Sequence, residues 1–314
     1  MLSRTADSLF WVARYAERAG NVARGLGVAW RMAGATAALG DEGAEWRSLL
    51  TASGGDAGFR RKYQDEAPGQ ENVVHWLVHD TDNPSSILQC FEAARRNARA
   101  VRTALTVDMW EALNDSWNHL RTLSPEATEG ERLPDFLSWV RERVTLFNGA
   151  AHDTMLRDEA WRFVHLGTML ERADNTARLL DVKHHLLRPE ADGAVDYVQW
   201  QAVLRSVSAL RAYQWIYRDR LDPRRIAELM VLRPELPRSL MACLAQVAET
   251  LDAIADGQGG RRGECHRLAG ELHARLRYGR MDAILEQGLH AFLTDMILRV
   301  AALGGEIEAF YIRG

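Results

Sequence analysis

Apolar side chains recur along almost the whole chain with the period of an α-helix. From Ser3 onward they stand three or four residues apart on one stripe, formed by Val12, Tyr15, Ala16, Ala19, Val22, Ala23, Leu26 and Trp30. No stretch of strand length alternates apolar and polar positions, and no hairpin turn separates two β-branched runs. The pattern therefore predicts an all-α fold, a bundle of long antiparallel helices.

Capping and helix-breaking residues between the apolar stripes set the expected helix limits. Asn83 is expected to cap a helix that has Pro84 at its first position. Residues 38–70 mix a short helix with a polar, glycine-containing loop. Further helices are expected over about 134–152, 158–187, 194–216, 223–231, 236–255, 262–278 and 281–312.

One segment of the sequence occurs twice. "MLSRTADSLFWVARYAERAGNVARGL" (1–26) aligns with "MLRDEAWRFVHLGTMLERADNTARLL" (155–180), with the whole E-R-A-x-N-x-A-R-x-L core in common. Shared alanine and leucine are ordinary in amphipathic helices, but a shared glutamate, asparagine and two arginines in register are not. The repeat predicts an internal duplication within a single domain, 1–314, with pseudo-repeat halves 1–154 and 155–314.

The repeated polar residues fall on one face of each helix. At about 100° per residue, Asn21 and Arg24 lie within about 40° of Glu17, with Arg18 beside them, opposite the apolar stripe. The second copy repeats this arrangement. We call these two sets the polar stripes; they consist of Glu17, Arg18, Asn21 and Arg24, and of Glu171, Arg172, Asn175 and Arg178.

Three interpretations of the polar stripes are open at this stage. They form a solvated face held by weak surface pairs, or an interhelical ionic lock that pairs Glu17 with Arg178 and Glu171 with Arg24. Alternatively, they line a cleft for an anionic or amino-acid-like ligand, since arginine offers a bidentate fork and asparagine both donates and accepts. Asparagine is a mediocre helix former, so its place in both copies indicates specific hydrogen bonds.

Composition and charge narrow the class of protein. A formal net charge of −4 over 314 residues gives no pull toward nucleic acid or an anionic membrane. Three widely spaced cysteines indicate a reducing compartment, and no apolar run is long enough to cross a bilayer. We expect a cytoplasmic protein with no nucleic-acid or membrane partner.

Other candidate chemistry is weak. His75 and His79 have helical metal-site spacing but no evident third ligand, so no metal site is expected. Asp158 opens a predicted helix, where an N-cap role is favoured. A degenerate third copy of the stripe, with Arg95 and Arg99, lies at 91–102. No nucleophile–base pair or phosphate-binding loop is evident, so the catalytic residues are unknown and independent enzyme activity is not favoured.

Four ordered segments together resemble the bacterial alpha-E domain family, all-helical proteins named for an E-R motif. The first is 1–26, and the second is "NPSSILQCFEAARRNARAVR" followed by "MWEALN". The third is "TMLRDEAWRFVHLGTMLERADNTARLL" and the fourth is "YRDRLDPRRIAELMVLRPELPRSLMACL". The resemblance carries the E-R motif onto Glu17–Arg18 and Glu171–Arg172.

The resemblance implies a setting for the protein. Such proteins accompany a circularly permuted ATP-grasp ligase, with a transglutaminase-like or proteasome-like peptidase as a further partner. It implies an accessory or co-catalytic role in ATP-dependent amide or peptide bond formation, with ATP and Mg²⁺ bound by the ligase and no cofactor bound directly. Two alternatives stay open: a purely structural adaptor, and an independent enzyme that uses Glu17 or Glu171 as a base or metal ligand.

Overall fold

The computed structural model describes residues 1–37, 43–64, 66–186 and 193–313. Within these ranges the chain forms fifteen α-helices and no strand. The helices are α1 (Ser3–Ala37), α2 (Ala44–Ser53), α3 (Asp56–Tyr63), α4 (Gln70–Val78), α5 (Ile87–Ala100), α6 (Val107–Leu120), α7 (Leu133–Thr154), α8 (Glu159–Leu186), α9 (Gly193–Ser206), α10 (Leu210–Tyr217), α11 (Pro223–Val231), α12 (Leu240–Gly257), α13 (Glu264–Arg277), α14 (Met281–Gln287) and α15 (Leu289–Ile307). The predicted all-α bundle is confirmed.

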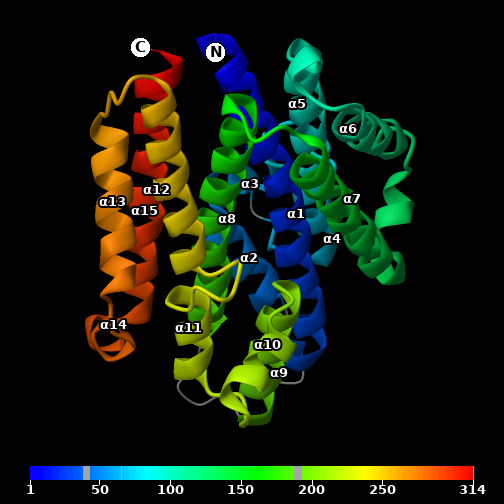
Figure 1. The fold of residues 1–314 in the computed structure, drawn as a ribbon. Helices are drawn as coiled ribbons and strands as arrows, with labels where there is room; N and C mark the ends of the chain where they lie inside the picture. Colours follow the sequence, from blue (N-terminus) through cyan, green and yellow to red (C-terminus); the bar gives the residue numbers. More distant parts are fainter. Residues whose placement is uncertain (38–42, 65, 187–192, 314) are drawn as a thin grey trace.

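The two longest helices, α1 and α8, form the centre of the bundle and run parallel (Figure 1). The amino group of Met1 lies 2.7 Å from the Glu159 carboxylate, and further along the pair Arg18 reaches Glu171. Residue numbers thus rise together along both helices. Helix α7 carries the chain back to the end at which α1 began (Figure 1). Helix α12 runs antiparallel to α8, since Gln258 after its end contacts Glu159 and Arg238 before its start contacts Thr176.

A glycine allows the central helices to approach closely. A Cβ added to Gly167 of α8 would overlap the carbonyl oxygen of Phe10 in α1, and it would also touch Ala13. A side chain at this position would therefore force the two helices to shift apart. The apolar side chains around this crossing, which include Leu9, Phe10 and Leu166, are fully buried.

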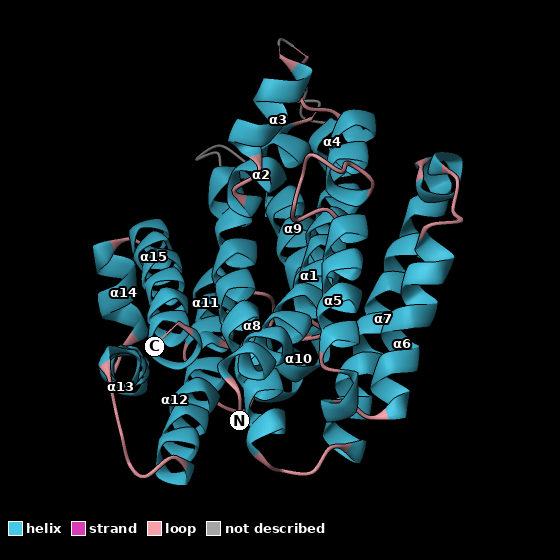
Figure 2. Ribbon diagram, turned by 90° about the horizontal axis from the view of Figure 1, so that it is seen from above, coloured by secondary structure: helices cyan, strands magenta, loops and turns pink. Residues whose placement is uncertain are grey.

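Each central helix has its own set of flanking helices. Helices α5 and α7 pack against α1, whereas α12 and α15 pack against α8. Figure 2 shows these two sets on opposite sides of the central pair. The short helices cross over: α2, which follows α1, packs on α8, and α9, which follows α8, packs on α1. The two sets of flanking helices are therefore joined along one central seam, the α1–α8 pair.

Several predicted helix limits are wrong for local reasons. The stretch 194–216 is broken between α9 and α10 at Ser208, which has a positive φ of 59°. The stretch 281–312 is broken at Gly288, with a φ of 98°, and ends in a π-helical turn. Ser86 rather than Asn83 caps α5, with its hydroxyl accepting from the amide of Gln89. Asn83 instead donates to the carbonyl of Trp76.

None of the helices in the described ranges combines the length and apolar character needed to cross a membrane. The same ranges hold no group of three or more His, Cys, Asp or Glu side chains placed to bind a metal ion. His75 contacts the hydroxyl of Tyr63, and His79 contacts that of Thr128.

Candidate functional site

The E-R dipeptides of the two polar stripes meet across the α1–α8 seam, and four of the eight stripe residues are buried. Glu17 is 1% exposed and Glu171 is 4% exposed, while Asn21 and Arg24 are also buried. The interpretation of the stripes as a solvated face is therefore wrong. Because α1 is surrounded by α5, α7, α8 and α9, most of its polar face is covered by other helices.

The two E-R dipeptides pair crosswise. Arg18 donates two hydrogen bonds to the Glu171 carboxylate, from Nε at 2.6 Å and from Nη2 at 3.0 Å. Arg172 grips Glu17 in the same way, from Nε at 3.3 Å and from Nη2 at 3.2 Å. Planar bidentate pairs of this kind combine strength with a fixed orientation. An ionic lock between α1 and α8 is therefore present.

The predicted partners within that lock are wrong. Glu17 pairs with Arg172 instead of Arg178, and Glu171 pairs with Arg18 instead of Arg24. In a parallel pair, residues with equivalent numbers lie at the same level, and Arg24 and Arg178 lie seven residues, about 10 Å, further along the axis. The neighbouring arginine in the sequence is thus the one that reaches across.

Each central carboxylate has a second arginine. Arg238, just before α12, donates to Glu17 at 2.8 Å, and Asn148 of α7 also donates to Glu17 at 3.1 Å. Arg14 donates to Glu171 at 2.8 Å. These residues were missed in the sequence, although Arg14 lies one turn before Glu17 on the same face. No sequence pattern identifies Arg238 as a partner of Glu17, because its side chain comes close to Glu17 only through the packing of α12.

Electrostatics keeps both glutamates ionised. Burial by itself would raise the pKa of Glu17, but the guanidinium charges of Arg172 and Arg238 outweigh burial and hold that pKa well below its usual range. For Glu171 the opposing charges are those of Arg18 and Arg14, and its pKa is also lowered. A carboxylate held in this way is a weak proton acceptor.

A cavity of about 500 Å³ opens on one side of the seam, within the usual size range of ligand pockets. Its walls come from α1, α2, α3, α4, α8 and α15, from the turn between α2 and α3 and from the segment just before α5. Five residues of the polar stripes line it: Arg18, Asn21, Glu171, Asn175 and Arg178. The other three, Glu17, Arg24 and Arg172, are not among its lining residues.

Two asparagine amides on the cavity wall have unused hydrogen-bonding capacity. Neither Nδ2 nor Oδ1 of Asn21, a residue only 6% exposed, has a hydrogen-bond partner among the described residues. The Nδ2 group of Asn175 likewise has none there. Buried polar groups are nearly always paired with protein, water or ligand. The unpaired amides therefore mark the cavity as a place where another polar molecule fits.

Charged groups of both signs also line this cavity. Arg178 contacts Asp174 at 2.7 Å and donates to the carbonyl of Ala52 at 3.1 Å. Burial raises the pKa of Asp174 although Arg178 lies beside it. Asp174 was not singled out in the sequence, despite its place within "ERADN". The wall thus offers cationic, anionic and amide groups to one ligand.

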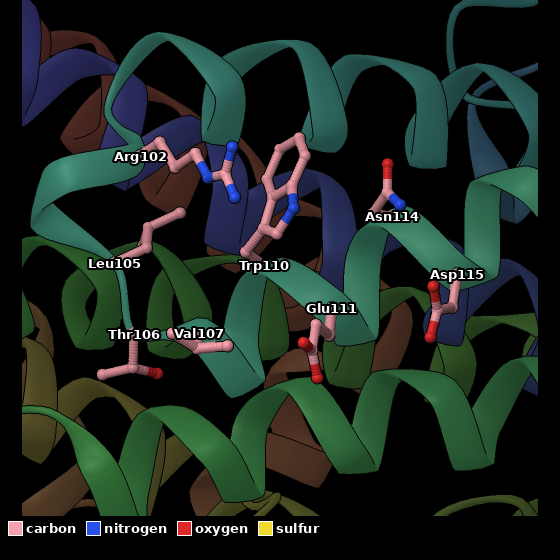
Figure 3. Close-up of a pocket in the computed structure, with 8 residues that line it drawn as sticks. All are labelled: Arg102, Leu105, Thr106, Val107, Trp110, Glu111, Asn114 and Asp115. Carbon is pink, nitrogen blue, oxygen red and sulfur yellow. The ribbon is translucent and has the colours of Figure 1, made fainter.

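The weaker candidates lie elsewhere. Asp158 accepts from the amide of Trp161 at the start of α8, so its predicted N-cap role is confirmed. Arg99 is exposed. Arg95 bonds Asn114 at 2.9 Å, at the edge of a separate surface hollow on α6. In that hollow the guanidinium of Arg102 lies beside the ring of Trp110, 5.0 Å from its centroid (Figure 3).

Comparison with known proteins places the chain in a family. A family model described as a predicted alpha-helical domain with a conserved ER motif, Alpha-E, matches residues 1–312. The chain belongs to the Alpha-E family. The crosswise pairs give a physical role to its E-R dipeptides at 17–18 and 171–172, because each one supplies both a carboxylate and the arginine for the opposite helix.

Similar sequences are known in mycobacteria. The Alpha-E chain is 27% identical to an uncharacterized protein of Mycobacterium tuberculosis and to one of Mycobacterium bovis. Each alignment covers 95% of this chain but 35% of the relative, so the chain spans about a third of the length of these proteins. No solved structure matches the chain.

Proposed function

We propose that this Alpha-E chain is a helical accessory subunit of an ATP-grasp-type amide or peptide ligase system. Its cavity holds the amino-acid or peptide substrate, and its surface docks the circularly permuted ligase, which binds ATP and Mg²⁺. A transglutaminase-like or proteasome-like peptidase is a further partner in the cytoplasm. The chain itself presents and orients substrate and has no independent activity.

The observation that carries the substrate-binding part is the unpaired Asn21 amide in the cavity wall. The same cavity is lined by the arginine Arg18 on its own helix and by the carboxylates of Glu171 and Asp174 on the other. Amino acids and peptides carry an ammonium, a carboxylate and amides, which are the groups that such a wall recognises. The greater length of the mycobacterial relatives supports a setting in which an Alpha-E region works beside other domains.

A purely structural adaptor is the second candidate, and the crosswise lock of Glu17, Arg18, Glu171 and Arg172 favours it. A buried pair of this kind fixes the register of two helices whether or not a ligand is present. An independent enzyme with Glu17 or Glu171 as its base is disfavoured, because two guanidinium groups lower the pKa of each carboxylate.

The test uses the full chain and the ATP-grasp ligase of the same organism. Co-purification measures docking, and ATP turnover by the complex with amino-acid substrates measures the contribution of the cavity. The informative variant is Asn21→Leu combined with Asn175→Leu, and the matched control is Asn118→Leu on the exposed face of α6. All variants are compared only after circular dichroism shows native helicity.

The proposed function predicts that the double variant still co-purifies and that substrate-dependent ATP turnover falls about tenfold or more, because two amide contacts are lost. The control keeps wild-type turnover. Unchanged turnover in the folded double variant would leave only the adaptor role. Failure of the wild-type chain to bind the ligase or alter its turnover would overturn the proposal.

A further inference from the structure

Two contacts of the polar stripes recur at the same spacing as the sequence repeat. Arg24 donates to the backbone carbonyl of Ser206 at 2.8 Å, and Arg178 donates to that of Ala52 at 3.1 Å. Both the two donors and the two acceptors are 154 residues apart in the sequence. The same offset relates the two E-R dipeptides. The surroundings of Glu17 can therefore be compared, residue by residue, with those of Glu171.

A second repeated segment lies beside each of the two glutamates, Glu17 and Glu171. "PSSILQC" (84–90) matches "PRSLMAC" (237–243) in its proline, second serine and cysteine. Ser86 caps α5 and Ser239 caps α12, with each serine accepting from an amide three residues later. Ser85 and Arg238 therefore occupy equivalent places, one residue before these caps.

The closed site, around Glu17, and the open site, around Glu171, differ in the oxygen that the second arginine reaches, because Arg14 donates to Oε2 of Glu171 whereas Arg238 donates to Oε1 of Glu17. At the closed site, Oε1 of Glu17 accepts from Arg172 and also from Arg238, at 2.8 Å. At the open site, Oε1 of Glu171 accepts from Arg18 at 2.6 Å, and no second donor to it comes from the described residues. Ser85, the counterpart of Arg238, is too short to serve and lines the cavity instead.

The open site also carries an additional carboxylate. Asp174 stands three residues after Glu171, whereas the corresponding residue after Glu17 is Gly20. A Cβ on Gly20 would already meet Val144 at 3.3 Å, so the closed site has little room there. Asp174 lines the cavity beside Glu171 and contacts Arg178 at 2.7 Å, so the open site has one carboxylate that the closed site lacks.

We propose that the cavity binds the cationic group of an amino acid or peptide, a guanidinium above all, at the place where Arg238 lies in the closed site. This rests on the proposed function and names its ligand class. The ligand cation contacts Glu171 Oε1 and Asp174, while Arg178 on the same wall receives a ligand carboxylate and the Asn21 amide binds its polar backbone. Free arginine carries all of these groups.

Titration calorimetry on the full chain tests this with two ligands. L-Arginine is the probe, and L-citrulline is its neutral isostere, in which a ureido group replaces the guanidinium. Charge-assisted hydrogen bonds are about twice as strong as neutral ones, so citrulline is expected to bind about tenfold or more weakly. Equal affinities for the two, or no binding of arginine, would overturn the ligand class.

A variant provides the second arm. Ser85→Arg places an arginine beside Glu171, as Arg238 lies beside Glu17. It is expected to abolish arginine binding while the chain stays folded. The matched control, Ser124→Arg on an exposed connection, is expected to bind as the wild type does. A folded Ser85→Arg protein that binds arginine with unchanged affinity would contradict the assignment.

These outcomes are separate from those of the accessory role. If arginine does not bind but the asparagine double variant still lowers ligase turnover, the ligand class fails and the accessory role stands. If arginine binds and no ligase docks, the reverse holds.

Discussion

The environments of Glu17 and Glu171 differ although their helices carry the same motif. Glu17 is closed in by Arg172, Arg238 and Asn148 and is 1% exposed. Glu171 is held by Arg18 and Arg14, and it forms part of the wall of a cavity of about 500 Å³. One framework has thus produced a structural ionic centre and a site with room for a ligand.

This comparison indicates that the E-R ion pairs are structural at both glutamates. The bidentate grip uses the same arginine atoms in both copies. What distinguishes the open site is the residue at the rim, Ser85 against Arg238, and the extra carboxylate of Asp174 against Gly20. Functional residues are therefore expected at the positions around the motif at which the two segments of this chain differ.

The largest predicted effect separates the two glutamates. Glu17→Ala leaves Arg172 and Arg238 without their carboxylate in a closed site, so it should lower the free energy of unfolding by about 3–5 kcal/mol. Glu171→Ala should cost less, because its partners Arg14 and Arg18 line an open cavity, where solvent can compensate their charges. Urea denaturation measures both. An equal or larger loss for Glu171→Ala would contradict the distinction between closed and open sites.

The next effect concerns the seam that both sites share. Gly167→Ala places a methyl group on the carbonyl of Phe10, so it should lower the free energy of unfolding by about 1–3 kcal/mol. Gly270→Ala is the control, because its Cβ meets nothing within 4 Å and its helical position favours alanine. Thermal unfolding that ranks Gly270→Ala as the more damaging change would contradict the tight parallel crossing.

Acid should weaken the seam through the same two carboxylates. Their folded pKa values lie below the usual 4.5, so their stabilisation is complete above pH 4.5 and is lost as the pH falls below it. Each contributes a slope of at most about 1.4 kcal/mol per pH unit in that window. Urea titrations from pH 3 to pH 6 should show a shallower slope in Glu17→Gln. An unchanged slope would contradict an ionised Glu17.

The smallest effect should come from opening the closed site. Arg238→Ser removes one partner of Glu17 but leaves Arg172 and Asn148, and it relieves repulsion with Arg24, whose pKa burial and Arg238 lower to about 9. The loss in free energy of unfolding should be about 1 kcal/mol. Arg121→Ser, at an exposed position, is the control. A loss as large as that of Glu17→Ala would show that Arg238 is indispensable to the centre.

The sequence predicted those features that depend on local periodicity. Helix α11 was placed at its observed limits, 223–231, and α8 was placed to within a residue at each end. The breaks at Ser208 and Gly288 were missed, because the apolar pattern continues through both residues and only the backbone φ reveals the turn. The internal duplication stays a prediction.

The candidate site was only partly predictable. The repeat drew attention to the right helix faces, and five of its eight residues line the cavity. The partners within the lock were wrong because sequence spacing does not reveal that α1 and α8 run parallel. Arg238 and Ser85 could not be found from the stripes, because they lie far away in the sequence and come into place only through the packing of α12 and α5.

The most direct test of the central claim is a crystal structure of the full chain grown with L-arginine. The account predicts one bound ligand, with its guanidinium within hydrogen-bond distance of Glu171 Oε1 and Asp174, and no ligand beside Glu17. A guanidinium bound at Glu17, or a cavity filled by the side chains of the protein itself, would contradict it.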